Sequence, residues 1–469
     1  MKIKLFSILF FCITYQGYAQ GNYSLVQCIE YSLQNHSSTE VYQNNIIIAK
    51  GRKKQAISYY LPQINVNSTV TDNLKLQTNI IPAGVLSDED ISMQFGKKYN
   101  SNIYGEITQT IYNQPAIYNI KSSQVNIKIA DLQQIQNSES IIFNTAQAYF
   151  QVLVYKEYKA KLQEIIQSYI QLLDILKLKH QKGIIIETDV ERVSVSLKSA
   201  EYQLNEVETQ IKNALDNLKF TMGLSLESEL HISDSTNYEQ YVSFPEIASL
   251  NINNLTEYEI NKTQQKLLEY NYKSQKAELL PTINLFSRAG KQGYSEDMSG
   301  IFDSWKDYSY IGVSVSMNLF SGLRKSSKIK ESKLVLKNSY TNLHLAETGY
   351  QLTFQNSEKN LLNAYNNLNG SKDNLELAKK ILDTSSLNYQ KGASPISVFL
   401  NDDNAYKNAQ LQYVNNLFSY MSRRLDYEKN KGTLFFKKNR VKCCVVPALQ
   451  NERLCYNRVI IDNVSHYNV

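Results

Sequence analysis

The sequence has few of the residues that build catalytic or metal sites. Its 469 residues include five cysteines, none of them in a Cys-x-x-Cys pair, and five histidines scattered along the chain. Glycine-rich phosphate loops and nucleophile motifs are absent as well. Disulfide frameworks and structural metal sites need grouped cysteines or histidines. The sequence therefore excludes a disulfide scaffold, predicts neither a metal ion nor another cofactor, and argues against an enzyme.

Long apolar runs and net charge are missing from most of the chain. After the N-terminus no segment reaches 18 consecutive apolar residues, so no helix is expected to cross a membrane. The formal net charge of +6 arises from Lys2 and Lys4, which contribute two charges, and from residues 433–469, which contribute four. The remainder is neutral, which removes the electrostatic support for nucleic-acid binding.

The N-terminus has the pattern of a secretory signal peptide. Lys2 and Lys4 precede an apolar stretch from Leu5 to Ile13, and Gly17-Tyr18-Ala19 supplies small residues where a signal peptidase cleaves. The apolar stretch is too short for a spanning helix. The sequence therefore predicts a signal peptide over 1–19 and an exported protein.

The chain contains an internal duplication. A helix-to-strand junction of the form Leu-Pro-x-Ile occurs at 61–64 and again at 280–283. In each copy a long helical run ends at a Lys-Gly pair, Lys182-Gly183 or Lys391-Gly392, and a further helix ends at a second glycine 40 positions on. Matched spacing of this kind marks repeats. We predict a first repeat over 20–224, a linker over 225–254, a second repeat over 255–432 and a basic C-terminal tail over 433–469.

Two segments in each repeat alternate apolar and polar residues, as a strand does when one face is apolar and the other wet. The predicted strands cover about 64–77 and 101–112 in the first repeat and about 283–293 and 308–319 in the second. A polar loop from Pro82 to Asn100 separates the first two. Each strand is long enough to cross a bilayer, which takes about 9 to 11 tilted residues.

Strands in lipid must close into a barrel, because unpaired backbone groups cannot stay in hydrocarbon. Single-chain barrels begin at about eight strands, so the four strands predicted here cannot close alone. Three chains giving twelve strands is the favoured assembly, and two chains giving eight is the alternative.

The helical segments are too long for a globular core. The run from Pro115 to about Leu178 would span roughly 96 Å at about 1.5 Å per residue. Its counterpart from Gly322 carries a large apolar residue every seven positions, namely Phe354, Leu361, Leu368, Leu375, Leu382 and Tyr389. The helix after Gly392 has two apolar stripes, which indicates two packing partners and hence a closed tube of helices. The predicted fold class is an α+β membrane protein built from a duplicated helix-strand-strand-helix-helix unit.

Taken together, these features resemble the TolC-like outer-membrane efflux channel family. The resemblance covers about residues 23–432 and rests on the doubled architecture, both Leu-Pro-x-Ile junctions, Asn318-Leu319-Phe320-Ser321-Gly322 after the last strand, and the two Lys-Gly turns. It implies a homotrimer in the cell outer membrane, whose twelve-stranded transmembrane β-barrel continues into a long periplasmic α-helical barrel. The implied function is the passive exit duct of a tripartite efflux or type I secretion system, gated at the periplasmic tip. The implied partners are outer-membrane lipid, a periplasmic adaptor protein and an inner-membrane transporter.

The resemblance also implies functional residues at the helical tip. The positions expected to dock the adaptor are Lys182, Gly183, Thr188, Asp189, Lys391 and Gly392. Tyr389 matches a tyrosine that helps hold the helices closed, and Asp189 matches its acidic partner. Three positions depart from the family pattern. Ser394 replaces an expected arginine, so one salt bridge cannot form, and the aspartates that ring the lumen in some relatives fall on Val398 and Asn401.

Asp402 and Asp403 follow Asn401 directly, so three copies of them could form a constriction that attracts cations. With Tyr389 and Asn401 they make up the predicted gate. The alternative interpretation is a solvated helix start, where acidic side chains complement the helix dipole.

A periplasmic or secreted coiled-coil structural protein is the alternative function. It explains the heptad spacing but not the amphipathic strands that follow Pro62 and Pro281. The tail over 433–469, with its vicinal Cys443-Cys444, matches nothing expected of the family.

Overall fold

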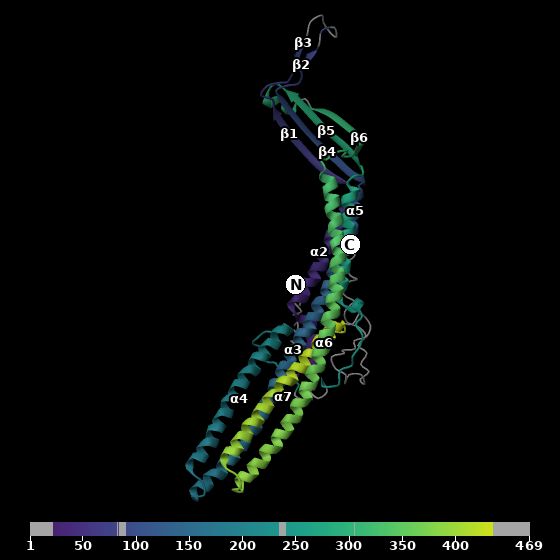
Figure 1. Cartoon of the computed structure of the whole chain (residues 1–469). Coiled ribbons are helices and arrows are strands. Elements are labelled where there is room, and N and C mark those ends of the chain that lie inside the picture. Colours follow the sequence, from purple (N-terminus) through teal and green to yellow (C-terminus); the bar gives the residue numbers. More distant parts are fainter. Residues whose placement is uncertain (1–21, 82, 84–90, 234–240, 304, 435–469) are drawn as a thin grey trace, which may run out of the picture. The chain divides into compact units, whose positions relative to one another are not determined.

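A computed structural model describes residues 22–81, 83, 91–233, 241–303 and 305–434. The predicted signal peptide, and the predicted tail beyond Leu434, lie outside the described residues. The chain forms two compact units (Figure 1). Of the described residues, a helical unit draws on 22–42, 134–233, 241–258 and 347–434, and a sheet unit on 43–81, 83, 91–133, 259–303 and 305–346. Each unit takes segments from both predicted repeats, so the repeats describe the order of elements along the chain and not separate bodies.

The sheet unit contains a four-stranded antiparallel sheet in the order β1-β4-β5-β6. The strands are β1 (Gln63–Asp72), β4 (Tyr99–Tyr112), β5 (Thr282–Ser295) and β6 (Lys306–Ser316). The central pair, β4 and β5, joins one repeat to the other, and β1 and β6 are the edge strands. β1 and β6 end earlier than the predicted strands at 64–77 and 308–319.

The two faces of this sheet differ in polarity. Register pairs Ile64 with Ile107 and Asn65 with Glu106, so apolar and polar side chains separate onto opposite faces. Several side chains of the apolar face are exposed in the single chain, including Ile107 at 46% and Val66 at 74%. We call the opposite face, which carries the Asn65 and Glu106 side chains, the wet face. A soluble protein rarely exposes an apolar surface of this extent, so the apolar face requires a partner.

The polar loop predicted from Pro82 to Asn100 is only partly a loop. Strand β3 (Ile91–Gln94) lies within it and pairs antiparallel with β2 (Thr78–Ile81). Each of these strands has only four residues, which is too short to establish an alternating pattern in the sequence.

Two helices of equal length lead into the sheet. α2 (Ser37–Ser58) precedes the junction at Pro62 and α5 (Thr256–Ala277) precedes that at Pro281. Proline has a fixed φ angle and no backbone N–H group to donate a hydrogen bond. It also disfavours the helical conformation of the residue before it, so helices end before a proline. A short helix, α1 (Leu25–Asn35), comes before α2 and starts at a capping box formed by Ser24 and Gln27.

The helical unit contains α4 (Glu187–Met222) and α7 (Ile396–Lys431), together with the second parts of α3 (Gln114–Gln181) and α6 (Arg324–Gln390). Figure 1 shows these four helices side by side. The predicted heptad seam of α6 is largely buried, with Phe354, Leu361, Leu368 and Tyr389 all 6% exposed or less. None of the described helices is both long and apolar enough to cross a membrane.

The shorter helices α4 and α7 end at glycines with a left-handed backbone, Gly223 (φ 73°) and Gly432 (φ 76°). Both glycines are also tightly packed. A Cβ at Gly223 would lie 2.9 Å from the carbonyl oxygen of Asn35, and one at Gly432 would lie 2.9 Å from backbone atoms of Asn254. Glycine is therefore required at these two positions by conformation and by space.

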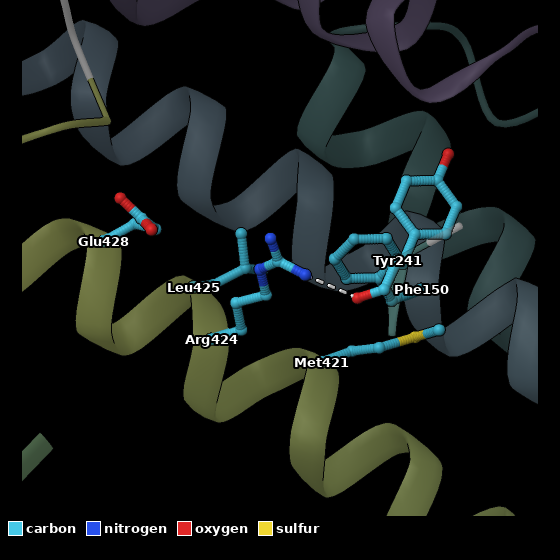
Figure 2. Close-up of a pocket in the computed structure, with 6 residues that line it drawn as sticks. All are labelled: Phe150, Tyr241, Met421, Arg424, Leu425 and Glu428. Carbon is cyan, nitrogen blue, oxygen red and sulfur yellow. Dashed lines mark hydrogen bonds between the residues drawn. The ribbon is translucent and has the colours of Figure 1, made fainter. Parts of the chain in front are cut away.

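The linker between the repeats packs along α7. Arg424 donates from Nη1 to the Tyr241 carbonyl oxygen at 2.7 Å, and the Tyr420 hydroxyl donates to the Ser243 carbonyl oxygen at 2.6 Å. Figure 2 shows a small pocket at this place, where the Tyr241 ring lies 5.2 Å from that of Phe150. The guanidinium group of Arg424, the cationic group that lines this pocket, is hydrogen-bonded to the linker. The pocket therefore holds the linker against α7.

Candidate docking and gating site

The predicted docking residues lie at two turns of the helical unit, one joining α3 to α4 and the other joining α6 to α7. Both turns contain a glycine with a left-handed backbone, with φ of 70° at Gly183 and 76° at Gly392. The Gly183 amide donates to the His180 carbonyl at 2.8 Å, and the Gly392 amide donates to the Tyr389 carbonyl at 3.0 Å. The next amide in each turn bonds one residue further back. Both long helices thus end in the same Schellman arrangement.

The two turns are in contact with each other. The Lys179 ammonium group at the end of α3 donates to the Gln390 carbonyl oxygen at the end of α6. Lys182 and Lys391 are exposed, and no ion pair is found for either within the part of the chain that the structure describes. Three exposed apolar side chains surround the first turn: Leu178, Ile184 and Ile186. Exposed apolar groups beside positive charge provide a surface for a protein partner.

Thr188 and Asp189 lie in the first turn of α4. Thr188 is exposed, and the Asp189 carboxylate lies 3.8 Å from Nη1 of Arg192. No side chain caps this helix at Ile186, so Glu187 and Asp189 place negative charge at its positive end. The dipole of α4 accounts for an acid at position 189 independently of any docking role.

Tyr389 is buried between the two turns. Its ring stacks on that of Phe399, with centroids 6.4 Å apart and an angle of 22° between the ring planes. Its hydroxyl is buried and has no hydrogen-bond partner among the described residues. Burial raises the pKa of Tyr389, and the negative charge of Asp189 raises it further. Tyr389 and Asp189 are therefore close enough to interact electrostatically but do not form a hydrogen bond within one protomer.

Asp403 is buried in a cluster that joins α7 to α3. Its side chain is 4% exposed, and its Oδ2 accepts a hydrogen bond from the Tyr169 hydroxyl. The Lys407 ammonium group lies 2.9 Å from the same oxygen and 4.7 Å from the centroid of the Tyr169 ring. Burial raises the pKa of Tyr169, and the neighbouring Asp403 carboxylate raises it further. The prediction that Asp403 forms part of an exposed constriction does not fit this position, because its carboxylate is bonded inside its own protomer.

Asn401 and Asp402 remain accessible. Asn401 is exposed and Asp402 is half-buried. α7 begins at Ile396, so Asp402 lies in the second turn of the helix, where the dipole effect has fallen off. The interpretation of Asp402 as a helix-start acid therefore does not account for it.

Sequence reasoning missed Tyr169 and Lys407. The spacing of four between Asp403 and Lys407 is visible in the sequence and indicates an ion pair on one helix face. Tyr169 lies 234 positions before Asp403, and no local pattern connects the two.

The sequence is similar to those of known outer membrane proteins. A family model for outer membrane efflux proteins matches residues 51–224. The outer membrane protein TolC of Salmonella enteritidis is 22% identical over 354 residues, covering 70% of this chain and 68% of that protein.

Solved outer membrane channels have a similar fold. The CmeC channel of Campylobacter jejuni matches with a TM-score of 0.71 and 17% identity, covering 89% of this chain and 87% of that one. VceC from Vibrio cholerae matches with a TM-score of 0.68 and 15% identity, covering 87% of this chain and 96% of that one. At these identities the likeness concerns the fold.

Proposed function

Because the chain belongs to the family of outer membrane efflux proteins, we propose that it forms the exit duct of a tripartite efflux or type I secretion system. It is an outer membrane channel with helices that extend into the periplasm, and a transport protein, not an enzyme. Cargo passes through it passively, so the energy for transport comes from a partner.

The observation that carries this proposal is the exposed apolar face of a sheet with two open edges. β1 and β6 each have one unpaired side, and Val66, Ile311 and Val313 on the apolar face are 63 to 74% exposed. Pairing β6 of one copy with β1 of the next closes the edges, and lipid covers the apolar face. Three copies give twelve strands, and two copies would give eight.

A coiled-coil structural protein, the alternative function, does not account for this sheet. A water-soluble coiled coil is not expected to contain four paired strands with an exposed apolar face, because soluble proteins rarely expose apolar surface of this extent.

The two helix turns form the proposed docking surface for a periplasmic adaptor protein. Support comes from the exposed residues Lys182, Lys391, Ile184 and Ile186, and from Thr188 beside them. The inner-membrane transporter engages through that adaptor and supplies the energy.

The proposed gate comprises Tyr389, Asn401 and Asp402. Three copies of Asp402 at a narrow place would favour cations. Asp402→Asn should lower the cation preference of single channels in a planar bilayer. Asn404→Asp, which adds a negative charge on the same helix where Asp402→Asn removes one, is the matched variant. An Asp402→Asn channel with the ion selectivity of the wild type would exclude Asp402 from the gate.

The native mass of the protein, extracted from outer membranes in mild detergent, tests the proposed function. Light scattering corrected for bound detergent should give three chains, and the same preparation should conduct ions in a planar bilayer. A mass of one chain without conductance would contradict the duct.

A further inference from the structure

The wet face of the sheet carries one row of side chains that crosses all four strands. Register aligns Asn65 of β1, Glu106 of β4, Arg288 of β5 and Tyr310 of β6. The row lies near the middle of β4, away from the strand ends. Its two charged members belong to different repeats.

Glu106 and Arg288 form an ion pair that aromatic rings hold in place. Nη2 of Arg288 lies 2.7 Å from Oε1 of Glu106. The guanidinium carbon lies 4.1 Å from the centroid of the Tyr104 ring and 5.7 Å from that of Tyr310. Gly290 stands directly opposite Tyr104 and leaves space there, since a Cβ would lie 2.5 Å from that of Tyr104. Cation–π contact with two rings restricts the guanidinium group to this position.

This pair supplies both charges in the centre of the wet face. The other charged side chain on the wet face of the four strands is Lys306, the first residue of β6. Lys291 and Asp307 form a second cross-strand ion pair, 3.3 Å long, but they alternate onto the apolar face. Without a partner, either Glu106 or Arg288 would present a full charge to the space in front of the sheet.

We propose that Glu106 and Arg288 are specificity-determining residues of the duct: their pairing keeps the pore wall neutral at this level, so that cargo of either charge sign can pass. The inference rests on the proposed function, because it takes the wet face as the wall of the duct. Three copies place three pairs at one level, and loss of one partner would create a ring of three like charges. Charged rings of this kind set the ion selectivity of channels.

Reversal potentials of single channels in a planar bilayer, measured across a salt gradient near 0.1 M, test this proposal. Removal of the cation in Arg288→Gln leaves Glu106 unpaired and should raise the cation-to-anion permeability ratio by at least about twofold over the wild type. Glu106→Gln leaves Arg288 unpaired and should lower the same ratio by at least about twofold. The double variant, Glu106→Gln with Arg288→Gln, should return to the wild-type ratio.

Lys291→Gln is the matched control, because it removes a lysine from a cross-strand pair of the same sheet on the other face. It should leave the permeability ratio unchanged. The native mass of each variant verifies that three chains assemble. Wild-type selectivity in both single variants, or a Lys291→Gln shift equal to that of Arg288→Gln, would overturn the proposal while leaving the duct itself in place. A wild-type trimer that passes no current would overturn the duct and this inference with it.

Discussion

Among individual residues, burial decides which side chains can react. Cys28 of α1 is fully buried in the core of the helical unit, next to residues of α3, α4 and α7. Burial raises the pKa of its thiol to about 12. The thiolate is the reactive form of cysteine, so a thiol in this environment is inert at neutral pH.

We expect Cys28 to resist alkylation in the native protein. With a pKa of about 12, about one thiol in ten thousand is ionised at pH 8. Iodoacetamide at pH 8 should leave the peptide that contains Cys28 unmodified in peptide mass spectrometry, and should modify it fully after unfolding in guanidinium chloride. Native labelling at the rate of the unfolded chain would show that α1 opens.

Asp403 is the residue whose position most affects the predicted site. Its sequence neighbours indicated an acid at the start of a helix, yet the side chain pairs with Lys407 and accepts from Tyr169. The helix that carries Asp403 was predictable from local spacing. The direction of the side chain was not, because it depends on a contact with a residue of α3 far away in the sequence.

The Lys407 ammonium group should stabilise the fold through this buried carboxylate. Lys407→Met leaves Asp403 charged and unpaired, and should lower the free energy of unfolding by about 3 to 5 kcal/mol. Thermal unfolding in detergent, followed by circular dichroism, measures this loss. Asp403→Asn added to Lys407→Met should recover most of the lost stability. Lys198→Met, which replaces an exposed lysine of α4, should change the free energy of unfolding by less than about 0.5 kcal/mol. Equal stability of Lys407→Met and Lys198→Met would contradict the pairing.

Among helices and strands, the predictable features are those with a regular period. The heptad residues of α6 and the alternation in β4 and β5 identify their elements because each buries or exposes one face. The hairpin β2–β3 has too few residues for a period. The glycine turns were predictable as helix ends, since glycine after a helix favours the left-handed backbone.

Replacement of the turn glycines should destabilise both turns alike. Gly183→Ala or Gly392→Ala forces a Cβ into the left-handed region and should cost about 1 to 2 kcal/mol. Gly370→Ala in the middle of α6, where no atom lies within 4 Å of the new Cβ, should instead stabilise by about 0.5 to 1 kcal/mol. Guanidinium unfolding curves compare the three variants. A gain of stability in Gly183→Ala would mean that the turn relaxes to another backbone.

For the whole protein, the assignment of sheet faces governs assembly. Val313 and Ser314 are neighbours on β6 and alternate onto the apolar and the wet face. Alternation within one strand separates its apolar from its polar positions, but which residues of the four strands share a face depends on their register.

Lysine at these two neighbouring positions should therefore have opposite outcomes. Val313→Lys places a charge on the face proposed to contact lipid and should cost about 2 to 4 kcal/mol per chain near the bilayer midplane. Native gel electrophoresis of outer membrane extracts should then show loss of the proposed trimer, whereas Ser314→Lys should assemble as the wild type does. The reverse result would exchange the two faces.

The glycines that end the helices differ in their surroundings, and this difference affects how the protein can change. Gly223 and Gly432 are packed against other backbone segments, whereas Gly183 and Gly392 have no atom within 4 Å of a would-be Cβ. The residues that directly flank the second pair, Lys182, Ile184, Lys391 and Ala393, are exposed, so they can be exchanged without rearranging the interior. Recognition at these turns is free to diverge, so one scaffold can acquire a new partner while its core stays the same.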